Sequence, residues 1–406
     1  MGWLPDRVSL GVLAASVPRE VVDVVVAEAG RGARRSGGVL PPHVVVYFVL
    51  ALALFADEDY EEVAARLAGT LADWDCWDGL WVVPTSGGLT QARQRLGSAP
   101  LVGLFDRVAV PVASELTRGA FVGSWRLMAI DGFEWDVPDS PANAEEFGYR
   151  AGGGGVAALP KVRVVTVSEC GSHAVVGAAV GSAGRGEQTV ARGLLSGFAA
   201  GWLVLADRNF YGFADWNTAR AGGAQLLWRV TSDLRLPVLR VLPDGSYLSV
   251  VIRPGVQGRF QRQDLHAAAA AGEDLDPAVA VAVRVVEYDV TDRGEHDDTI
   301  RLITTILDPA DASAAVLADA YHQRWEHETG NDQLKTHLRG PGRVLRSKSP
   351  DMVVQEIYGY LLTHHAISAL ICRAATEADI DPDRVKFLRT VRIVRRRVED
   401  PAAFSP

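Results

Sequence analysis

The sequence predicts an α/β protein in which a sheet-forming region is flanked along the chain by two helical regions. Residues 1–118 carry helix-length apolar patterns separated by loops that contain Gly and Pro. From Trp125 onward, short apolar runs typical of buried strands alternate with helical patterns. Helical patterns return after residue 308. This order is typical of a sheet that packs against helices.

Composition narrows the class of protein. With 406 residues, the chain can form one large core or two to three domains. Hydrophobic residues make up 48% and charged residues 22%, which excludes a disordered chain. The cysteines Cys76, Cys170 and Cys372 are scattered and form no CxxC motif. A disulfide framework or a structural zinc site is therefore not expected, and the cytoplasm is the predicted compartment.

Charge and hydropathy bear on the partners. The longest apolar run, residues 44–56, is too short to span a bilayer and predicts a buried helix, so no membrane partner is expected. The net charge is −9, but residues 321–398 carry 14 Lys and Arg against 9 Asp and Glu. An acidic body with a basic C-terminal segment can bind a polyanion locally.

One helix of the N-terminal region, within residues 83–97, follows a Ser/Gly turn and carries Arg93 and Arg95. It is similar to the second half of a helix-turn-helix, whose polar face contacts DNA. A bundle helix with one hydrated face explains the pattern equally well. Both interpretations stay open from the residues alone.

The predicted sheet begins with an apolar strand, 125–131, that ends on Asp131, and a later strand, 202–207, ends on Asp207. Between them the pattern predicts a hairpin, 161–180, and a helix, 187–201. This is the order of the ribonuclease-H-like fold, in which those two strands are neighbours. Asp131 and Asp207 are therefore expected side by side, although either alone could cap a following helix.

The rest of the chain divides into three parts. Strand-like segments within 231–307 predict a β-rich insertion, so the ribonuclease-H-like catalytic core is expected at 119–230 and 308–340. Residues 341–406 predict a helical, basic C-terminal region. It opens with a basic Gly/Pro loop and closes with a basic segment that either contacts phosphates or forms a solvated amphipathic helix. The loop carries Arg343, Arg346 and Lys348.

A polar helix is predicted over residues 321–335. At 100° per residue, its side chains Tyr321, Arg324, Glu328 and Lys335 fall within a stripe about 60° wide. An exposed helix with ion pairs would also produce such a stripe.

Asp131, Asp207 and an acid of the polar helix form a set of carboxylates suited to a hard divalent cation. The helical wheel leaves that third acid open between Glu328 and Asp332, which lies on the same side of the helix. Mg²⁺ prefers oxygen ligands, and two such ions about 4 Å apart can activate the attacking oxygen and stabilise the leaving oxygen of a phosphodiester. A glycosidase pair could be drawn from the same acids. It would leave Arg324 and Lys335 unexplained, whereas phosphate recognition accounts for both.

These residues resemble a known family, the DDE transposases of the insertion-sequence-four group. The matching segments are Ile130-Asp131-Gly132, then Asp136-Val-Pro-Asp-Ser-Pro-Ala-Asn143, then Leu205-Ala-Asp207-Arg-Asn-Phe-Tyr-Gly212, and finally Tyr321-x2-Arg324-x3-Glu328-x6-Lys335. The last is the Tyr-Arg-Glu-Lys signature of the family at its full spacing, and the resemblance covers most of the chain. One departure is Phe133, where relatives commonly have a small hydroxyl residue.

The resemblance implies a function and a set of roles. The family cuts DNA with activated water and then uses the freed 3′-hydroxyl for hairpin formation and strand transfer. The resemblance implies that Asp131, Asp207 and Glu328 hold two Mg²⁺ or Mn²⁺ ions. Tyr321, Arg324 and Lys335 would hold phosphates and the DNA end, with Tyr321 assisting a displaced base. Further DNA contacts are expected from Arg208, Arg229, Arg93, Arg95, Arg343, Arg346 and Lys348.

The implied partners are the terminal inverted repeats of a transposon and target DNA, bound by a homodimer on paired ends near the bacterial nucleoid. Residues 1–118 would support DNA binding and dimerisation. Two alternatives share the fold. One is a domesticated DNA-binding protein without transposition, and the other is a metal-dependent DNA nuclease.

Overall fold

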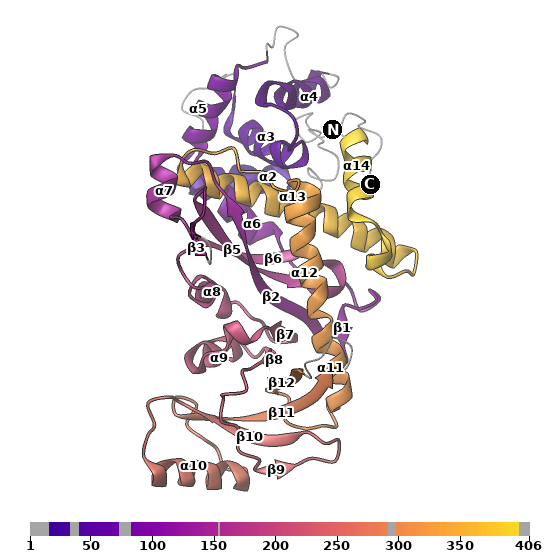
Figure 1. Ribbon diagram of the computed structural model, residues 1–406. Coiled ribbons are helices and arrows are strands. Elements are labelled where there is room, and N and C mark those ends of the chain that lie inside the picture. Colours follow the sequence, from indigo (N-terminus) through magenta and orange to yellow (C-terminus); the bar gives the residue numbers. More distant parts are fainter. Residues whose placement is uncertain (1–15, 33–39, 73–82, 153–154, 291–297, 398–406) are drawn as a thin grey trace.

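The computed structural model describes residues 16–32, 40–72, 83–152, 155–290 and 298–397. The molecule is elongated, with helices at one end, a large sheet in the middle and α10 at the other end (Figure 1). It is a mixed α/β structure, as the sequence predicts.

Within the described residues of the N-terminal region, the regular elements are all helices. The helix α3 has an apolar side chain at nearly every position from Val44 to Leu54, and all of these are buried. The predicted buried helix is therefore confirmed. No helix in the described part of the chain is long and apolar enough to cross a membrane. The helices are α2 (Arg19–Glu28), α3 (Pro42–Leu54), α4 (Tyr60–Ala72), α5 (Ser86–Leu96) and α6 (Ala99–Val108).

The central sheet has 10 strands in the order β6-β5-β2-β7-β8-β12-β11-β10-β9, with β1 paired to β2. Only the pairs β2–β7 and β7–β8 are parallel. A two-stranded ribbon lies apart, β3 (Ala151–Gly152) with β4 (Gly155–Val156). The sheet strands are β1 (Phe121–Val122), β2 (Trp125–Asp136), β5 (Lys161–Glu169), β6 (Val175–Ser182), β7 (Trp202–Ala206), β8 (Gln225–Arg229), β9 (Arg240–Val241), β10 (Tyr247–Ile252), β11 (Ala280–Val290) and β12 (Asp298–Thr304).

The strand β2 is longer than predicted. It runs through Asp131 to Asp136, because its antiparallel pairing with β5 continues to Asp136↔Lys161. Its parallel pairing with β7 ends at Ile130↔Ala206. Asp131 therefore lies where the parallel pair ends, rather than at the end of its own strand.

Alternate side chains of β2 face two different layers. Met128 and Ile130 point toward α8 (Glu187–Leu195) and α9 (Phe213–Arg220). Leu127 and Ala129 contact α11 (Ala314–His322) on the other face. Further along the same face, Trp135 packs beneath α13 (Pro350–Glu377). The period of two along a strand thus sorts the residues into two cores.

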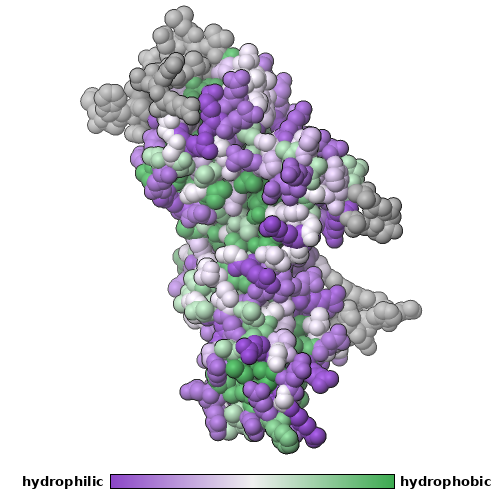
Figure 2. All heavy atoms as spheres, turned by 90° about the vertical axis from the view of Figure 1, so that its left-hand side faces the viewer, coloured by the Kyte–Doolittle hydropathy of each residue, from purple (hydrophilic) through white to green (hydrophobic). Residues whose placement is uncertain are grey.

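The strands of residues 231–307 extend this same sheet, since β12 pairs antiparallel with β8. The segment also contains α10 (Arg259–Ala271), a helix that the strand-like patterns did not predict. None of the α10 residues is buried. Figure 2 shows this side of the molecule, where hydrophobic groups gather toward the lower end and polar groups surround them.

The polar helix at 321–335 is divided rather than uniform. It comprises the end of α11, then α12 (Arg324–Asp332), then a π-helix η4 (Gln333–Leu338). The remaining elements are α7 (Pro141–Phe147), η2 (Cys170–Ser172), η3 (Arg208–Phe210), η5 (Pro382–Arg384) and α14 (Phe387–Arg397). The long α13 crosses between the N-terminal helices and the sheet (Figure 1).

Candidate active site

Two carboxylates lie where the parallel pairing of β2 with β7 ends. Asp131 follows Ile130 of β2, Asp207 follows Ala206 of β7, and Ile130 and Ala206 are paired. Because the two strands run in the same direction, the residues that directly follow a paired position lie next to each other. The predicted pairing of these two strands is confirmed.

Asp131 is confined. Its side chain is 21% exposed, and its Oδ1 accepts a hydrogen bond from the Gly132 amide at 2.9 Å. Burial raises the pKa of the Asp131 carboxyl, and the negative charges of Glu328 and Asp207 raise it further. The Gly132 amide and the Arg324 guanidinium oppose this change. Crowded carboxylates of this kind favour a cation between them.

Arg324 links the helix to the strand. Its Nη2 lies 2.9 Å from Oε1 of Glu328, and its Nη1 lies 3.8 Å from Oδ2 of Asp131. The first contact follows from the i,i+4 spacing, which places both side chains on one face of α12. The guanidinium therefore occupies the space between the two carboxylates.

Glu187 is a fourth acid near Asp131, and the sequence did not single it out. It is the first residue of α8, and an ideal Cβ built on Gly132 would lie 2.1 Å from its Oε1. Burial, reinforced by Asp131, raises the pKa of Glu187 to about 7. Acids are common in the first turn of a helix, so its sequence position alone carried no signal.

Tyr321 lies inside the core. It is 5% exposed and belongs to the apolar cluster that contains Leu127 and Leu205. Its hydroxyl has no hydrogen-bond partner within the described residues, and burial raises its pKa. The Arg324 guanidinium lies 5.9 Å from the centre of its ring.

Lys335 lies on the π-helix and is half-buried. Its Nζ is 6.0 Å from the ring centre of Phe133, within the range of a cation–π contact. Phe133 thus contacts one of the signature residues. A π-helix has more residues per turn than an α-helix. The direction of the Lys335 side chain therefore differs from the one that an α-helical wheel gives.

Arg93 departs from the expectation of a DNA contact. It is fully buried, and its guanidinium donates to Gln355 Oε1 at 2.8 Å, to Ser347 Oγ at 3.2 Å and to the Tyr60 hydroxyl. These bonds fix α5 against α13. Because the Arg93 side chain is fully buried, it cannot contact a phosphate in this structure.

Arg343 and Arg346 are also engaged inside the protein. Arg343 Nη1 donates to the Ala56 carbonyl at 2.7 Å, and Arg346 Nη1 donates to the Glu58 carbonyl at 2.7 Å. Both arginines therefore bind backbone carbonyls of the loop between α3 and α4. Three other predicted contacts, Arg95, Arg208 and Lys348, are exposed, and Arg229 is half-buried.

The carboxylates fit a hard cation by chemistry, because all the donors are oxygen atoms. No three His, Cys, Asp or Glu side chains in the described ranges converge closely enough to hold a metal. The Arg324 guanidinium lies near both Asp131 and Glu328.

Comparison with known proteins decides the family. A model described as insertion element 4 transposase N-terminal matches residues 7–106, and one described as transposase DDE domain matches residues 125–364. The chain is a DDE transposase of the IS4 family. The DDE match includes Asp131, Asp207 and Glu328. This transposase is therefore a nucleic-acid-processing enzyme from a family that generally depends on divalent metal ions.

Two curated proteins and one solved structure are similar to the chain. The transposase is 26% identical over 390 residues to transposase InsG for insertion sequence element IS4 of Escherichia coli (strain K12), covering 95% of this chain and 82% of that protein. It is 29% identical over 173 residues to the putative transposase InsZ of the same organism, covering 42% of this chain and 55% of that protein. A solved piggyBac transposase synaptic complex with hairpin DNA matches with a TM-score of 0.47 and 12% identity, over 96% of this chain and 82% of that chain.

Proposed function

We propose that this transposase excises and inserts DNA by a cut-and-paste route, with Asp131, Asp207 and Glu328 as its metal-binding triad. One observation carries the proposal. Asp131 and Asp207 lie where the parallel pairing of β2 with β7 ends, and the helix that bears Glu328 is tied to Asp131 through Arg324. The assignment brings together three acids from distant parts of the chain.

Each residue of the site has a proposed task. The three carboxylates would hold two Mg²⁺ or Mn²⁺ ions, which supply activation of the attacking hydroxyl and stabilisation of the leaving oxygen. Arg324 exchanges its carboxylate partners for a phosphate, since a guanidinium binds both groups in the same bidentate manner. Lys335 holds a second phosphate, and Tyr321 supports a displaced base at a hairpin end.

The architecture supports a ribonuclease-H-like core formed by residues 119–230 and 308–340, with 231–307 as its insertion. A central parallel pair, β2 with β7, flanked by an antiparallel hairpin, β5 with β6, is consistent with that core. The proposed role of residues 1–118, whose described part contains helices, is DNA binding and dimer support. Residues 341–406 are proposed as a basic C-terminal region, whose described part is helical.

The proposed substrates are the inverted repeats at transposon ends and a target duplex, bound by a homodimer on paired ends. Exposed Arg208, Arg95 and Lys348 and half-buried Arg229 remain proposed DNA contacts. Arg93, Arg343 and Arg346 are left out, because their donors bind side chains or carbonyls of this chain.

Cleavage of a duplex that carries the inverted repeats flanking the gene tests the proposal. In Mg²⁺, wild type should cut at the repeat end, and Glu328→Gln should cut at least about 1000-fold more slowly, since a lost metal ligand removes several kcal/mol of transition-state stabilisation. Asp319→Asn, which changes an exposed carboxylate on α11, should match wild type. Equal cleavage by Glu328→Gln refutes the triad. Cutting of DNA without repeats at the same rate indicates a nuclease instead.

A further inference from the structure

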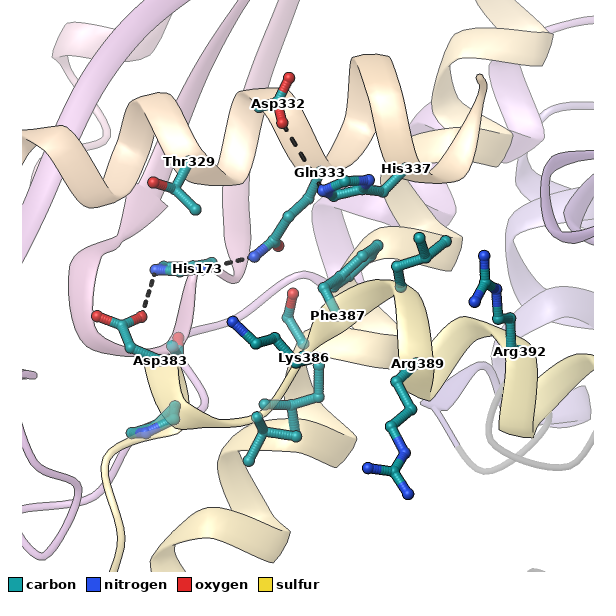
Figure 3. Close-up of a pocket in the computed structure, with 16 residues that line it drawn as sticks. His173, Thr329, Asp332, Gln333, His337, Asp383, Lys386, Phe387, Arg389 and Arg392 are labelled. Carbon is teal, nitrogen blue, oxygen red and sulfur yellow. Dashed lines mark hydrogen bonds and ion pairs between the residues drawn. The ribbon is translucent and has the colours of Figure 1, made fainter. Parts of the chain in front are cut away.

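A pocket of about 570 Å³ lies beside α12 and η4, away from the three carboxylates. Its lining includes Thr329 and Asp332 of α12 and His337 of η4, but not Asp131, Asp207 or Glu328. Figure 3 shows the pocket between α12 and η4 on one side and α14 on the other, with η5 at one end. The pocket nevertheless adjoins the proposed catalytic centre, because its lining residue Thr329 directly follows Glu328 in the chain.

Three cationic residues, one directly before α14 and two on it, form a cation row along the edge of this pocket. Its apolar side chains pack into the core, with Phe387 5% exposed and Val391 and Val394 fully buried. On a helical wheel these residues occupy one side. The opposite side then carries the exposed side chains Lys386, Arg389 and Arg392, all of which line the pocket.

The acids of the pocket already have partners. Asp383 Oδ1 lies 3.0 Å from His173 Nε2, and Asp332 accepts a hydrogen bond from Thr336 Oγ1 at 2.5 Å. Asp332 Oδ2 also lies 3.8 Å from His337 Nε2.

The cation row lacks such partners. Throughout the part of the chain that the structure describes, Lys386, Arg389 and Arg392 form no ion pair with a carboxylate. Arg395 of the same helix differs, because its Nε donates to the Leu54 carbonyl at 2.6 Å. The row therefore has positive charge available for an external ligand, whereas Arg395 has a structural contact.

The wall facing the row is fixed by buried polar contacts. His173 is 8% exposed and adopts a left-handed conformation with φ 58°. Its Nδ1 lies 2.9 Å from Gln333 Nε2, and Gln333 Oε1 lies 3.1 Å from His364 Nε2. The turn after β5, the π-helix and α13 are thereby joined. The wall of the pocket that faces α14 is therefore held in place before a ligand binds.

We infer that the pocket and the row Lys386–Arg389–Arg392 form a DNA-backbone site that is separate from the triad. The inference rests on the proposed function, because it takes the same duplex as its ligand. The row spans about 9 Å along α14. Three successive phosphates of one strand span about 7 Å along the duplex axis, at roughly 3.4 Å per step, so the row is long enough to reach all three. The site holds duplex that passes beside α12 while the triad acts on the scissile phosphate.

Salt-dependent DNA binding tests this site. Affinity for a fluorescein-labelled duplex of about 30 base pairs is measured by anisotropy in EDTA, from about 50 to about 200 mM salt. The variant Lys386→Ala/Arg389→Ala/Arg392→Ala should reduce the slope of log K against log salt by about 0.9 per lost contact, or about 2.7 in all. Arg389→Ala alone should reduce it by about 0.9, which supplies a milder variant that keeps the helix.

A charge-matched control is Arg235→Ala/Arg240→Ala/Arg259→Ala, because these arginines are exposed, lie outside α14 and form no ion pair within the described residues. Its slope should stay near that of wild type, and all variants should show the thermal unfolding of wild type. An unchanged slope in the row variant, or an equal drop in the control, overturns the inference.

Asp131→Asn separates this site from the proposed catalysis. That variant should keep the wild-type slope while losing cleavage. If Asp131→Asn still cleaves and the row variant still loses slope, the proposed triad fails and the backbone site stands.

Discussion

Arg93 and Arg95 lie two positions apart on α5 and have opposite surroundings. Arg93 is fully buried among Gln355, Ser347 and Tyr60, whereas Arg95 is exposed. The sequence could not show which of the two arginines is buried, because an arginine on an exposed helix face and one in a buried hydrogen-bond network look alike in the sequence. The role of Arg93 is decided by buried partners such as Gln355 and Ser347, which lie far away in the sequence.

This difference predicts opposite effects of substitution. Arg93→Ala should lower the free energy of unfolding by about 3 kcal/mol, because it leaves buried polar groups without donors. Arg95→Ala should change it by no more than about 0.5 kcal/mol. Urea unfolding of both variants checks this. Comparable losses from the two would show that Arg93 does not have the structural role assigned to it.

Glu187 predicts a pH dependence of stability in metal-free protein. Its folded pKa, about 7, lies above its ordinary value of 4.5, because of burial and the nearby Asp131. The folded state then binds more protons than the unfolded state between these pH values, so this residue destabilises the fold as pH rises from about 4.5 to about 7. Glu187→Gln removes that contribution.

The measurement is urea unfolding in EDTA at acidic and alkaline pH. Glu187→Gln should be stabilised relative to wild type more at pH above about 7 than at pH below about 5. The difference between the two proteins isolates this residue from other titrating groups. A difference that does not change with pH would contradict the placement of Glu187 beside Asp131.

At the scale of elements, strands and long helices followed from their patterns. The strand pair that carries Asp131 and Asp207 and the buried helix α3 were predicted from apolar runs and their order. The break at Gln323 and the π-helix at 333–338 were not, since they depend on how α12 packs against β2 and α13. Likewise α10 was missed, because its face is polar and Ala-rich with no buried residue.

The close crossing of α3 and α13 could not be predicted from the sequence either. It depends on Gly359. An ideal Cβ at this position would lie 2.8 Å from Val49 Cγ1 and 3.1 Å from the Val49 carbonyl oxygen. Helix backbones approach this closely only where a side chain is absent. The glycine therefore sets the distance between the N-terminal helices and the rest of the molecule.

Two Gly→Ala substitutions test that crossing. Gly359→Ala should destabilise the protein by about 1–3 kcal/mol, because overpacking outweighs the gain in helix propensity. Gly193→Ala on α8, where nothing lies within 4 Å, should instead stabilise it by up to about 1 kcal/mol. Thermal and urea unfolding give both values. A stabilised Gly359→Ala would mean that the helices are not in close contact there.

At the scale of the whole molecule, the proposed site exists only when the full sheet and the helices of its face are assembled. Asp131 and Asp207 come from two strands, and Glu328 comes from a helix more than 100 residues later in the chain. The spacing of the signature indicated Glu328, and strand order indicated the two aspartates. Glu187 and the Arg324 bridge required the folded arrangement.

The central claim is that these three acids hold the catalytic metal, and a change of metal preference tests it most directly. Asp207→Cys should lose cleavage of the inverted-repeat duplex in Mg²⁺ by at least about 100-fold, because a hard ion binds sulfur poorly. In Mn²⁺ the variant should recover at least about 10-fold, since this transition metal accepts a thiolate more readily. Asp319→Cys should cleave normally in both ions. Full activity of Asp207→Cys in Mg²⁺, or no recovery in Mn²⁺, would contradict the account.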